Sequence, residues 1–370
     1  MAGRGTAPTR RRRAVRALLA TLAALAVAAA GLGGLVVWQH SYDLREEAVT
    51  VRHGGHVLKG VLALPADGEG PFPLVVFVHG DGPVDATHDS FYRPIWEALA
   101  EAGYASLSWN KPGVGGAPGD WLDQSMDDRA DEAAGAIAWA RTRPEIDGRR
   151  IGLWGASQAG WVLPKITARV PGVRFAIAVS PAVNWHRQGR YNLLAELRRD
   201  GASDTETAAA LRRREKVLEL LERDASHEEY VRAMGDGHGM TAARWRFVAR
   251  NHTADAGADL PALRGVPLLL VLAGKDVNVD TAETESVYRK LLPGPALRVA
   301  HYPGASHSLV RDDVESSPLR LPLTALFAPR GLFAEGFLAD QRDFLASLDT
   351  ASTPSREAGA EPWRDGNRTP

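Results

Sequence analysis

The sequence contains no cysteine among its 370 residues. This absence excludes disulfide bonds, thiolate nucleophiles, zinc sites built on cysteine, and lipid attachment through cysteine. The chain also lacks a charge excess, because 44 basic and 45 acidic side chains nearly cancel, so no global field would recruit nucleic acid. No set of ligands has the spacing of a metal site. We therefore expect no nucleic acid, metal ion or other cofactor, and serine is the natural nucleophile.

The amino-terminal region is asymmetric in charge. A basic segment over residues 1–16 precedes an uncharged run over residues 17–38, which is long enough to span a bilayer as a helix. Arginines before the run and acidic residues after it favour an amino terminus inside and a catalytic body outside the cytoplasm. The alternative is a secreted protein with a cleaved signal, since Ala28-Ala29-Ala30 could serve a signal peptidase. We favour an uncleaved membrane anchor because the apolar run continues to Trp38.

Residues 39–349 alternate between strand and helix patterns. Continuous apolar runs are typical of strands buried on both faces, and Gly54-Gly55 indicates a hairpin turn. The alternation predicts an α/β fold with a mostly parallel central sheet and helices on both faces. The expected strands cover residues 47–65 as a hairpin, 74–78, 104–109, 151–156, 173–179, 267–273 and 297–302, and the expected helices cover residues 91–102, 129–141, a stretch ending near 169, 281–292 and 336–348.

Two stretches break this alternation. Between residues 181 and 261 no strand pattern occurs and charged helical stretches dominate, which predicts a helical cap inserted over the carboxyl edge of the sheet. Residues 350–370 are rich in Pro, Gly, Arg and Glu, a composition typical of a disordered tail.

An acidic cluster opens one of the expected helices. Ser125-Met126-Asp127-Asp128 has the spacing of a helix cap. We therefore interpret Asp127, Asp128, Asp131 and Glu132 as side chains that favour the start of a helix rather than as a metal site.

Ser157 lies where an apolar strand runs into a helix pattern. Gly155 and Ala159 flank it two residues on either side, and Gly160 follows. A reactive serine needs a sharp turn with small neighbours, so this stretch predicts a nucleophile elbow. The pattern by itself also occurs in ordinary strand-to-helix turns, and the rest of the chain must decide between the two.

A carboxylate and a histidine follow in the order that such an elbow needs. Asp276 comes just after an expected strand, at the end where sites in parallel sheets gather. Asp280 competes with it, but the spacing from Asp280 to Glu283 is that of a capping box. His307 follows the last strand. In this triad His307 would take the Ser157 proton, and Asp276 would orient the imidazole and stabilise its charged form.

The loop His79-Gly80-Asp81-Gly82 follows an earlier strand. Acyl transfer creates an oxyanion that needs preorganised N–H donors. The backbone of Asp81 and the N–H of Gln158 fit those positions, so both are predicted to form the oxyanion hole. His79 itself is expected to shape the loop rather than to abstract a proton.

These motifs, in this order, resemble the α/β-hydrolase superfamily, nearest to its esterase, dienelactone-hydrolase-like and prolyl-oligopeptidase-like serine hydrolases. The resemblance covers residues 47–349 and rests on residues 79–82, 155–160, 274–276 and 304–307. It implies the α/β-hydrolase fold and cleavage of carboxylic esters or related small acyl compounds through an acyl-enzyme. Two positions depart from the usual pattern: Ala159 replaces a glycine, and Trp109-Asn110-Lys111-Pro112-Gly113 stands where relatives often have Asp-x-Arg-Gly.

Other functions remain open at this point. A peptidase or an acyltransferase could use the same serine, and an inactive binding protein could keep the scaffold, although such proteins commonly lose a triad member. The cap is expected to determine specificity. Its aromatic side chains predicted to line the substrate pocket are Trp185, Tyr191, Trp245 and Phe247.

Overall fold

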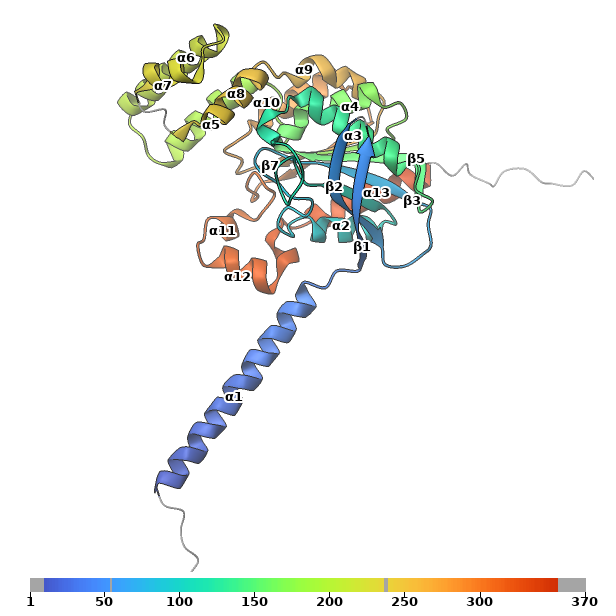
Figure 1. Cartoon of the computed structure of the whole chain (residues 1–370), viewed down its shortest axis with the longest axis vertical. Helices are drawn as coiled ribbons and strands as arrows, with labels where there is room; N and C mark the ends of the chain where they lie inside the picture. The colour runs from blue at the N-terminus through green and yellow to red at the C-terminus, as the bar shows by residue number, and fades with distance from the viewer. Residues whose placement is uncertain (1–9, 54, 236–238, 352–370) are drawn as a thin grey trace, which may run out of the picture.

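The computed structural model describes residues 10–53, 55–235 and 239–351. Its centre is an eight-stranded sheet with the order β1-β2-β4-β3-β5-β6-β7-β8 (Figure 1). The first two strands form an antiparallel hairpin, β2 pairs antiparallel with β4, and the pairings from β4 to β8 are parallel. The strands are β1 (Leu44–His53), β2 (His56–Pro65), β3 (Phe72–Val78), β4 (Ala105–Trp109), β5 (Ile146–Ala156), β6 (Ala176–Val179), β7 (Leu268–Ala273) and β8 (Leu297–Tyr302).

The central strands are apolar on both sides because helices cover both faces. In β3, Leu74, Val76 and Val78 pack into one core and Val75 and Phe77 into the other, as the two-residue period of a strand requires. The first core is closed by α3 (Met126–Ala140), α4 (Leu163–Arg169) and α10 (Thr281–Leu291), and the second by α2 (Arg93–Glu101) and α13 (Phe337–Ala351). The predicted α/β architecture is confirmed.

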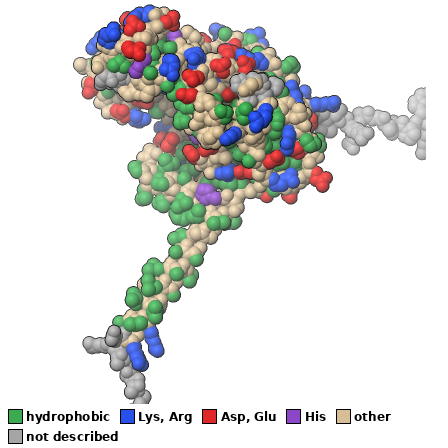
Figure 2. Space-filling model, in the orientation of Figure 1, with side chains coloured by type: hydrophobic (Ala, Val, Ile, Leu, Met, Phe, Trp, Pro, Cys, Tyr) green, Lys and Arg blue, Asp and Glu red, His purple; other side chains and the backbone are tan. Residues whose placement is uncertain are grey.

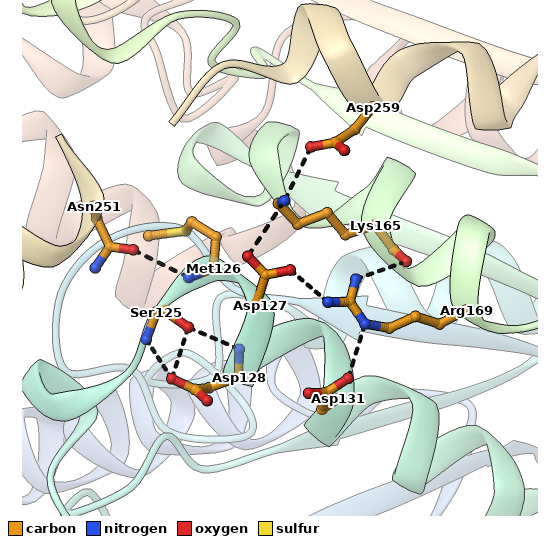
Figure 3. Close-up of polar contacts among 9 residues, drawn as sticks. All are labelled: Ser125, Met126, Asp127, Asp128, Asp131, Lys165, Arg169, Asn251 and Asp259. Carbon is orange, nitrogen blue, oxygen red and sulfur yellow. Dashed lines mark hydrogen bonds and ion pairs between the residues drawn. The ribbon is translucent and has the colours of Figure 1, made fainter. Parts of the chain in front are cut away.

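The start of α3 explains the acidic cluster (Figure 3). Ser125 and Asp128 form a reciprocal capping box, with distances of 3.0 Å from Asp128 N to Ser125 Oγ and 2.7 Å from Ser125 N to Asp128 Oδ2. The helix-start interpretation is therefore confirmed for Asp128. Two other members of the cluster instead join α3 to α4 through ion pairs: Asp127 with Lys165 and Arg169, and Asp131 with Arg169.

Helices fill the predicted cap between β6 and β7 (Figure 1). The cap helix that ends at Asn251 is bonded to the body, because Asn251 Oδ1 accepts the Met126 N–H at 3.1 Å at the start of α3 (Figure 3). The cap helices are α5 (Trp185–Arg199), α6 (Asp204–Glu222), α7 (His227–Met234) and α8 (Ala242–Asn251), and α9 (Ala256–Asp259) with the 3₁₀ helix η4 (Leu260–Leu263) leads back to the sheet.

Several element boundaries differ from the sequence-based expectations. Strand β5 begins at Ile146, five residues before the expected start, and the segment after His307 contains α11 (Asp312–Glu315), α12 (Arg320–Phe327) and η5 (Pro329–Leu332), none of which is expected from the sequence. Helix α13 continues to Ala351, so the first two residues of the predicted tail are helical, and the tail over residues 352–370 lies outside the described residues. Two further 3₁₀ helices are η1 (Trp121–Asp123) and η2 (Ser157–Trp161).

Helix α1 (Arg10–Gln39) projects away from the body (Figure 1). Its residues 12–39 are long and apolar enough to cross a membrane: an 18-residue stretch within them has a mean hydropathy of 2.1, and none of that stretch is buried. A secretory signal sequence also has an apolar helix of this kind near the amino terminus. The second half of the predicted basic segment forms the first turns of this helix, and residues 1–9 lie outside the described residues.

Candidate active site

Ser157 occupies a strained turn at the end of β5. Its φ angle is +55°, in the left-handed region that a side chain rarely adopts. The turn needs Gly155, because a Cβ there would lie 2.8 Å from the Cβ of Ala159. It also needs Gly160, whose added Cβ would lie 2.4 Å from the carbonyl oxygen of Ala182. This is the local geometry predicted for a nucleophile elbow, and Ala159 fits it while fully buried.

Asp276 and His307 form a hydrogen-bonded pair. Nδ1 of His307 lies 2.7 Å from Oδ2 of Asp276, whose side chain is only 1% exposed. The other carboxylate oxygen accepts the N–H groups of Asn278 and Val279, both at 2.8 Å. Asp280 instead caps α10 by accepting two backbone N–H groups. The structure thus brings Asp276, and not Asp280, to His307.

Ser157 and His307 border one cavity of about 450 Å³. No hydrogen bond joins their side chains among the described residues, which is common before substrate binds. Gly80 lies directly against the serine, since a Cβ at that position would be 3.4 Å from Ser157 Cβ and 3.9 Å from Ser157 Oγ. Within the same described ranges, no group of three or more His, Asp or Glu side chains could hold a metal ion.

Two buried basic side chains, Lys111 and Arg129, hold the loop that precedes Asp81. Nζ of Lys111 donates to the carbonyl of Gly80 at 2.5 Å, and Arg129 donates to the carbonyl of His79. In a trans peptide the N–H points opposite to the C=O, so the Lys111 bond turns the N–H of Asp81 away from Lys111. Burial lowers the pKa of Lys111 well below its ordinary value and lowers the pKa of Arg129 to about 10.

The two predicted oxyanion residues are joined through their side chains. Nε2 of Gln158 donates to Oδ1 of Asp81 at 3.2 Å, while Oε1 of Gln158 accepts from Arg129 at 2.6 Å. Arg244 of the cap binds both carboxylate oxygens of Asp81, at 3.0 and 2.6 Å. Burial raises the pKa of Asp81, but the hydrogen bonds and charge of Arg244 outweigh it and hold the pKa below its ordinary value.

The sequence does not single out Lys111 and Arg129. The available signal is that Lys111 belongs to residues 109–113, where the chain departs from its relatives.

His79 shapes the loop as expected: its ring nitrogens contact Trp109 O at 2.5 Å and Tyr92 OH at 3.1 Å. Burial lowers the pKa of His79 to about 3, so this ring is neutral near pH 7.

The four aromatic side chains predicted to line the pocket do not border this cavity. Trp245 and Phe247 are buried within the cap, and the Tyr191 hydroxyl donates to the backbone carbonyl of Asp276 at 2.8 Å. Trp185 is half-buried at the start of α5. Substrate contact by these side chains stays a prediction. The cap side chains that border the cavity are Gln188 and Asn192, both on α5.

A serine in left-handed backbone at the end of a central parallel strand, in a sheet of this order, defines a hydrolase of the α/β-hydrolase fold. A family model agrees with this class: the family described as "Serine aminopeptidase, S33" matches residues 70–314. The chain therefore belongs to the S33 family of α/β-hydrolases.

Individual relatives share less with the chain. The uncharacterized peptidase YuxL of Bacillus subtilis strain 168 is 27% identical over 165 residues, which are 42% of this chain and only 24% of YuxL. Among solved structures, the Pyrococcus furiosus esterase Pf2001 has a TM-score of 0.53 at 16% identity, covering 82% of this chain and 91% of that one. The α/β hydrolase GrgF from Penicillium sp. sh18 has a TM-score of 0.54 at 19% identity, covering 82% and 99%. At these identities the likeness shows the fold alone.

Proposed function

We propose that the chain is a serine hydrolase that cleaves carboxylic esters or related acyl compounds through Ser157, Asp276 and His307. The observation that supports this most is the 2.7 Å hydrogen bond between His307 Nδ1 and Asp276 Oδ2. It orients the imidazole and leaves Nε2 as the nitrogen that can accept a proton at the cavity bordered by Ser157.

The reaction then follows from these groups. Ser157 Oγ attacks the carbonyl carbon while its proton passes to His307 Nε2, and the carbonyl electron pair moves to oxygen. The N–H groups of Asp81 and Gln158 stabilise this oxyanion. The ester C–O bond breaks as His307 returns the proton to the departing alcohol oxygen. A water molecule, deprotonated by His307, then attacks the acyl-enzyme, and release of the acid regenerates the Ser157 hydroxyl.

A peptidase using the same residues is the second candidate. The family description and the printed name of YuxL favour it, whereas the Pyrococcus neighbour is called an esterase. Both reactions pass through the same acyl-enzyme, so they differ in the leaving group rather than in the nucleophile.

We further propose that α1 anchors the protein in a membrane, with the body outside the cytoplasm. The support is an exposed apolar helix of sufficient length that begins with arginines. Full-length protein should sediment with membranes and resist extraction by salt. Recovery of soluble mature protein beginning near Gly31 would establish cleavage of a signal instead.

A fluorophosphonate probe tests the nucleophile directly. We expect the full chain to be labelled and Ser157→Ala to be unlabelled, whereas Ser316→Ala, which removes an exposed hydroxyl bonded to its own helix, keeps the label. Turnover of nitrophenyl acetate should fall by about 10⁴-fold in Ser157→Ala. Comparing nitrophenyl esters with aminoacyl-nitroanilides separates the esterase from the peptidase. Retained turnover in folded Ser157→Ala would refute the assignment.

A further inference from the structure

The large apolar side chains left exposed fall into two groups among the described residues. One group lies along α1, and the other consists of four leucines at α12, with exposed fractions between 36% and 68%. Figure 2 shows hydrophobic side chains gathered on this part of the body beside the end of α1. We call this group the α12 patch; its members are Leu319, Leu321, Leu323 and Leu326. Clustered exposed leucines mark an interaction surface, whereas single ones do not.

Polar contacts join the region of the α12 patch to the carboxyl-terminal end of α1. Nε2 of His40 lies 3.0 Å from the carbonyl oxygen of Leu326. The Arg330 guanidinium donates to the carbonyls of Gln39 and Ser41 at 2.8 and 2.9 Å. The last turn of α1 also carries an exposed Trp38, a residue type that favours the boundary between lipid and water. If α1 spans a membrane, α12 therefore lies at that boundary.

A second cavity, of about 380 Å³, opens beneath this patch. Its walls come from both membrane-side elements, with Tyr42 after α1 and Leu321 and Ala325 from α12. It shares wall residues with the cavity at Ser157, so the two cavities adjoin. The shared residues are His88, Phe91 and Ser308.

We propose that α12 lies in the bilayer surface with its leucines among the lipid chains, and that the substrate is a membrane-resident acyl ester. Its acyl group reaches Ser157 from the bilayer through the 380 Å³ cavity. This inference rests on the proposed serine hydrolase and its anchor. We assign the α12 patch to the bilayer, rather than to a protein partner, because α12 contacts α1. The exposed apolar side chains of both helices would be covered by the same lipid.

Labelling tests the contact without relying on activity. Since the chain has no cysteine, Leu323→Cys introduces a single thiol for a bimane fluorophore in the full-length protein. In phosphatidylcholine vesicles carrying nitroxide on the acyl chains, we expect strong quenching of this label. The matched control is Ala209→Cys, exposed on α6 of the cap, where we expect no quenching.

The other outcomes of this experiment count against the proposal. An unquenched Leu323→Cys label in protein that floats with the vesicles would place α12 in water. A blue-shifted but unquenched label would mean that a second copy or another protein covers the patch. Protein that fails to float with the vesicles would refute the proposed anchor, and the membrane-surface placement with it.

Activity tests the route. Leu319→Gln/Leu323→Gln/Leu326→Gln should lower hydrolysis of nitrophenyl palmitate in phosphatidylcholine vesicles by about ten-fold or more, because polar side chains cannot enter the lipid. Hydrolysis of nitrophenyl acetate in water should stay unchanged, and the corresponding triple Met variant should keep both activities. Equal palmitate hydrolysis by the Gln variant and wild type would overturn the route. Absence of both acetate hydrolysis and fluorophosphonate labelling in the wild type would instead overturn the proposed function.

Discussion

The cap and the α12 segment (residues 312–332) cover neighbouring cavities but are built differently. In the cap, α6 and α7 begin with capping boxes, Ser203 with Glu206 and Ser226 with Glu229. The cap also buries aromatic rings, including Trp245. The N-cap residue of α12, Leu319, makes no capping hydrogen bond through its side chain, and the helix has no buried residue and exposes its leucines.

This difference indicates the medium that each region faces. A helical region in water is favoured by capped helix ends, polar outer faces and an apolar interior. The cap has these features, and its Gln188 and Asn192 present polar groups to the cavity at Ser157. Helix α12 buries no residue and exposes leucines on its outer side. It is held against α1 by the contact of His40 with the Leu326 carbonyl and by Arg330, which follows the helix. The two regions that flank the cavity at Ser157 thus differ in polarity.

The largest expected effect is on kcat, at Asp276 of the proposed triad, which lies between the two regions. Asp276→Asn should lower kcat by about 10⁴-fold, because an amide no longer holds the imidazole in the productive tautomer. Soluble and vesicle-borne esters should be affected alike, since both reach the same serine. The matched control is Asp280→Asn, which keeps a good N-cap and should leave kcat nearly unchanged. The reverse ranking would move the triad.

The next largest expected effect is on the free energy of unfolding, which should respond differently to substitutions in the cap and in α12. Trp245 is buried in the cap, where its indole N–H donates to the carbonyl of Ala225 at 2.8 Å. Trp245→Ala should therefore lower the free energy of unfolding by about 3–5 kcal/mol, whereas Leu323→Ala should change it by about 0.5 kcal/mol or less. Urea unfolding followed by circular dichroism measures both. A large loss for Leu323→Ala would mean that α12 belongs to the folded core.

The smallest effect concerns the ion pair between Arg244 of the cap and Asp81 in the loop over residues 79–82. Arg244→Met removes the partner of Asp81, and a partly exposed ion pair contributes about 1 kcal/mol at most. We expect kcat/KM to fall by about five-fold for soluble and vesicle-borne esters alike, unlike the selective loss expected for the α12 patch. Arg246→Met, exposed on the same helix, is the control. An equal loss in both variants would argue against a specific role for Arg244.

The central strands and the elbow were open to prediction because their requirements are local. A strand covered on both faces must be apolar throughout, as in β3. Helix α12 could not be predicted, because its local pattern indicates a different structure. Leu319, Leu321 and Leu323 recur every second residue, which is typical of a strand, and Pro322 interrupts the run. Pro322 is tolerated because it lies in the first turn of the helix.

The sequence by itself determined the alternating strands and helices, the small residues around Ser157, and the order of serine, carboxylate and histidine. Only the tertiary structure decided which carboxylate meets His307, because Asp276 and Asp280 follow the same strand and differ in what the fold brings to them. It also decided that the leucines of α12 stay exposed beside α1. That exposure depends on contacts such as His40 with Leu326, 286 positions apart, and no local pattern encodes a contact over such a separation.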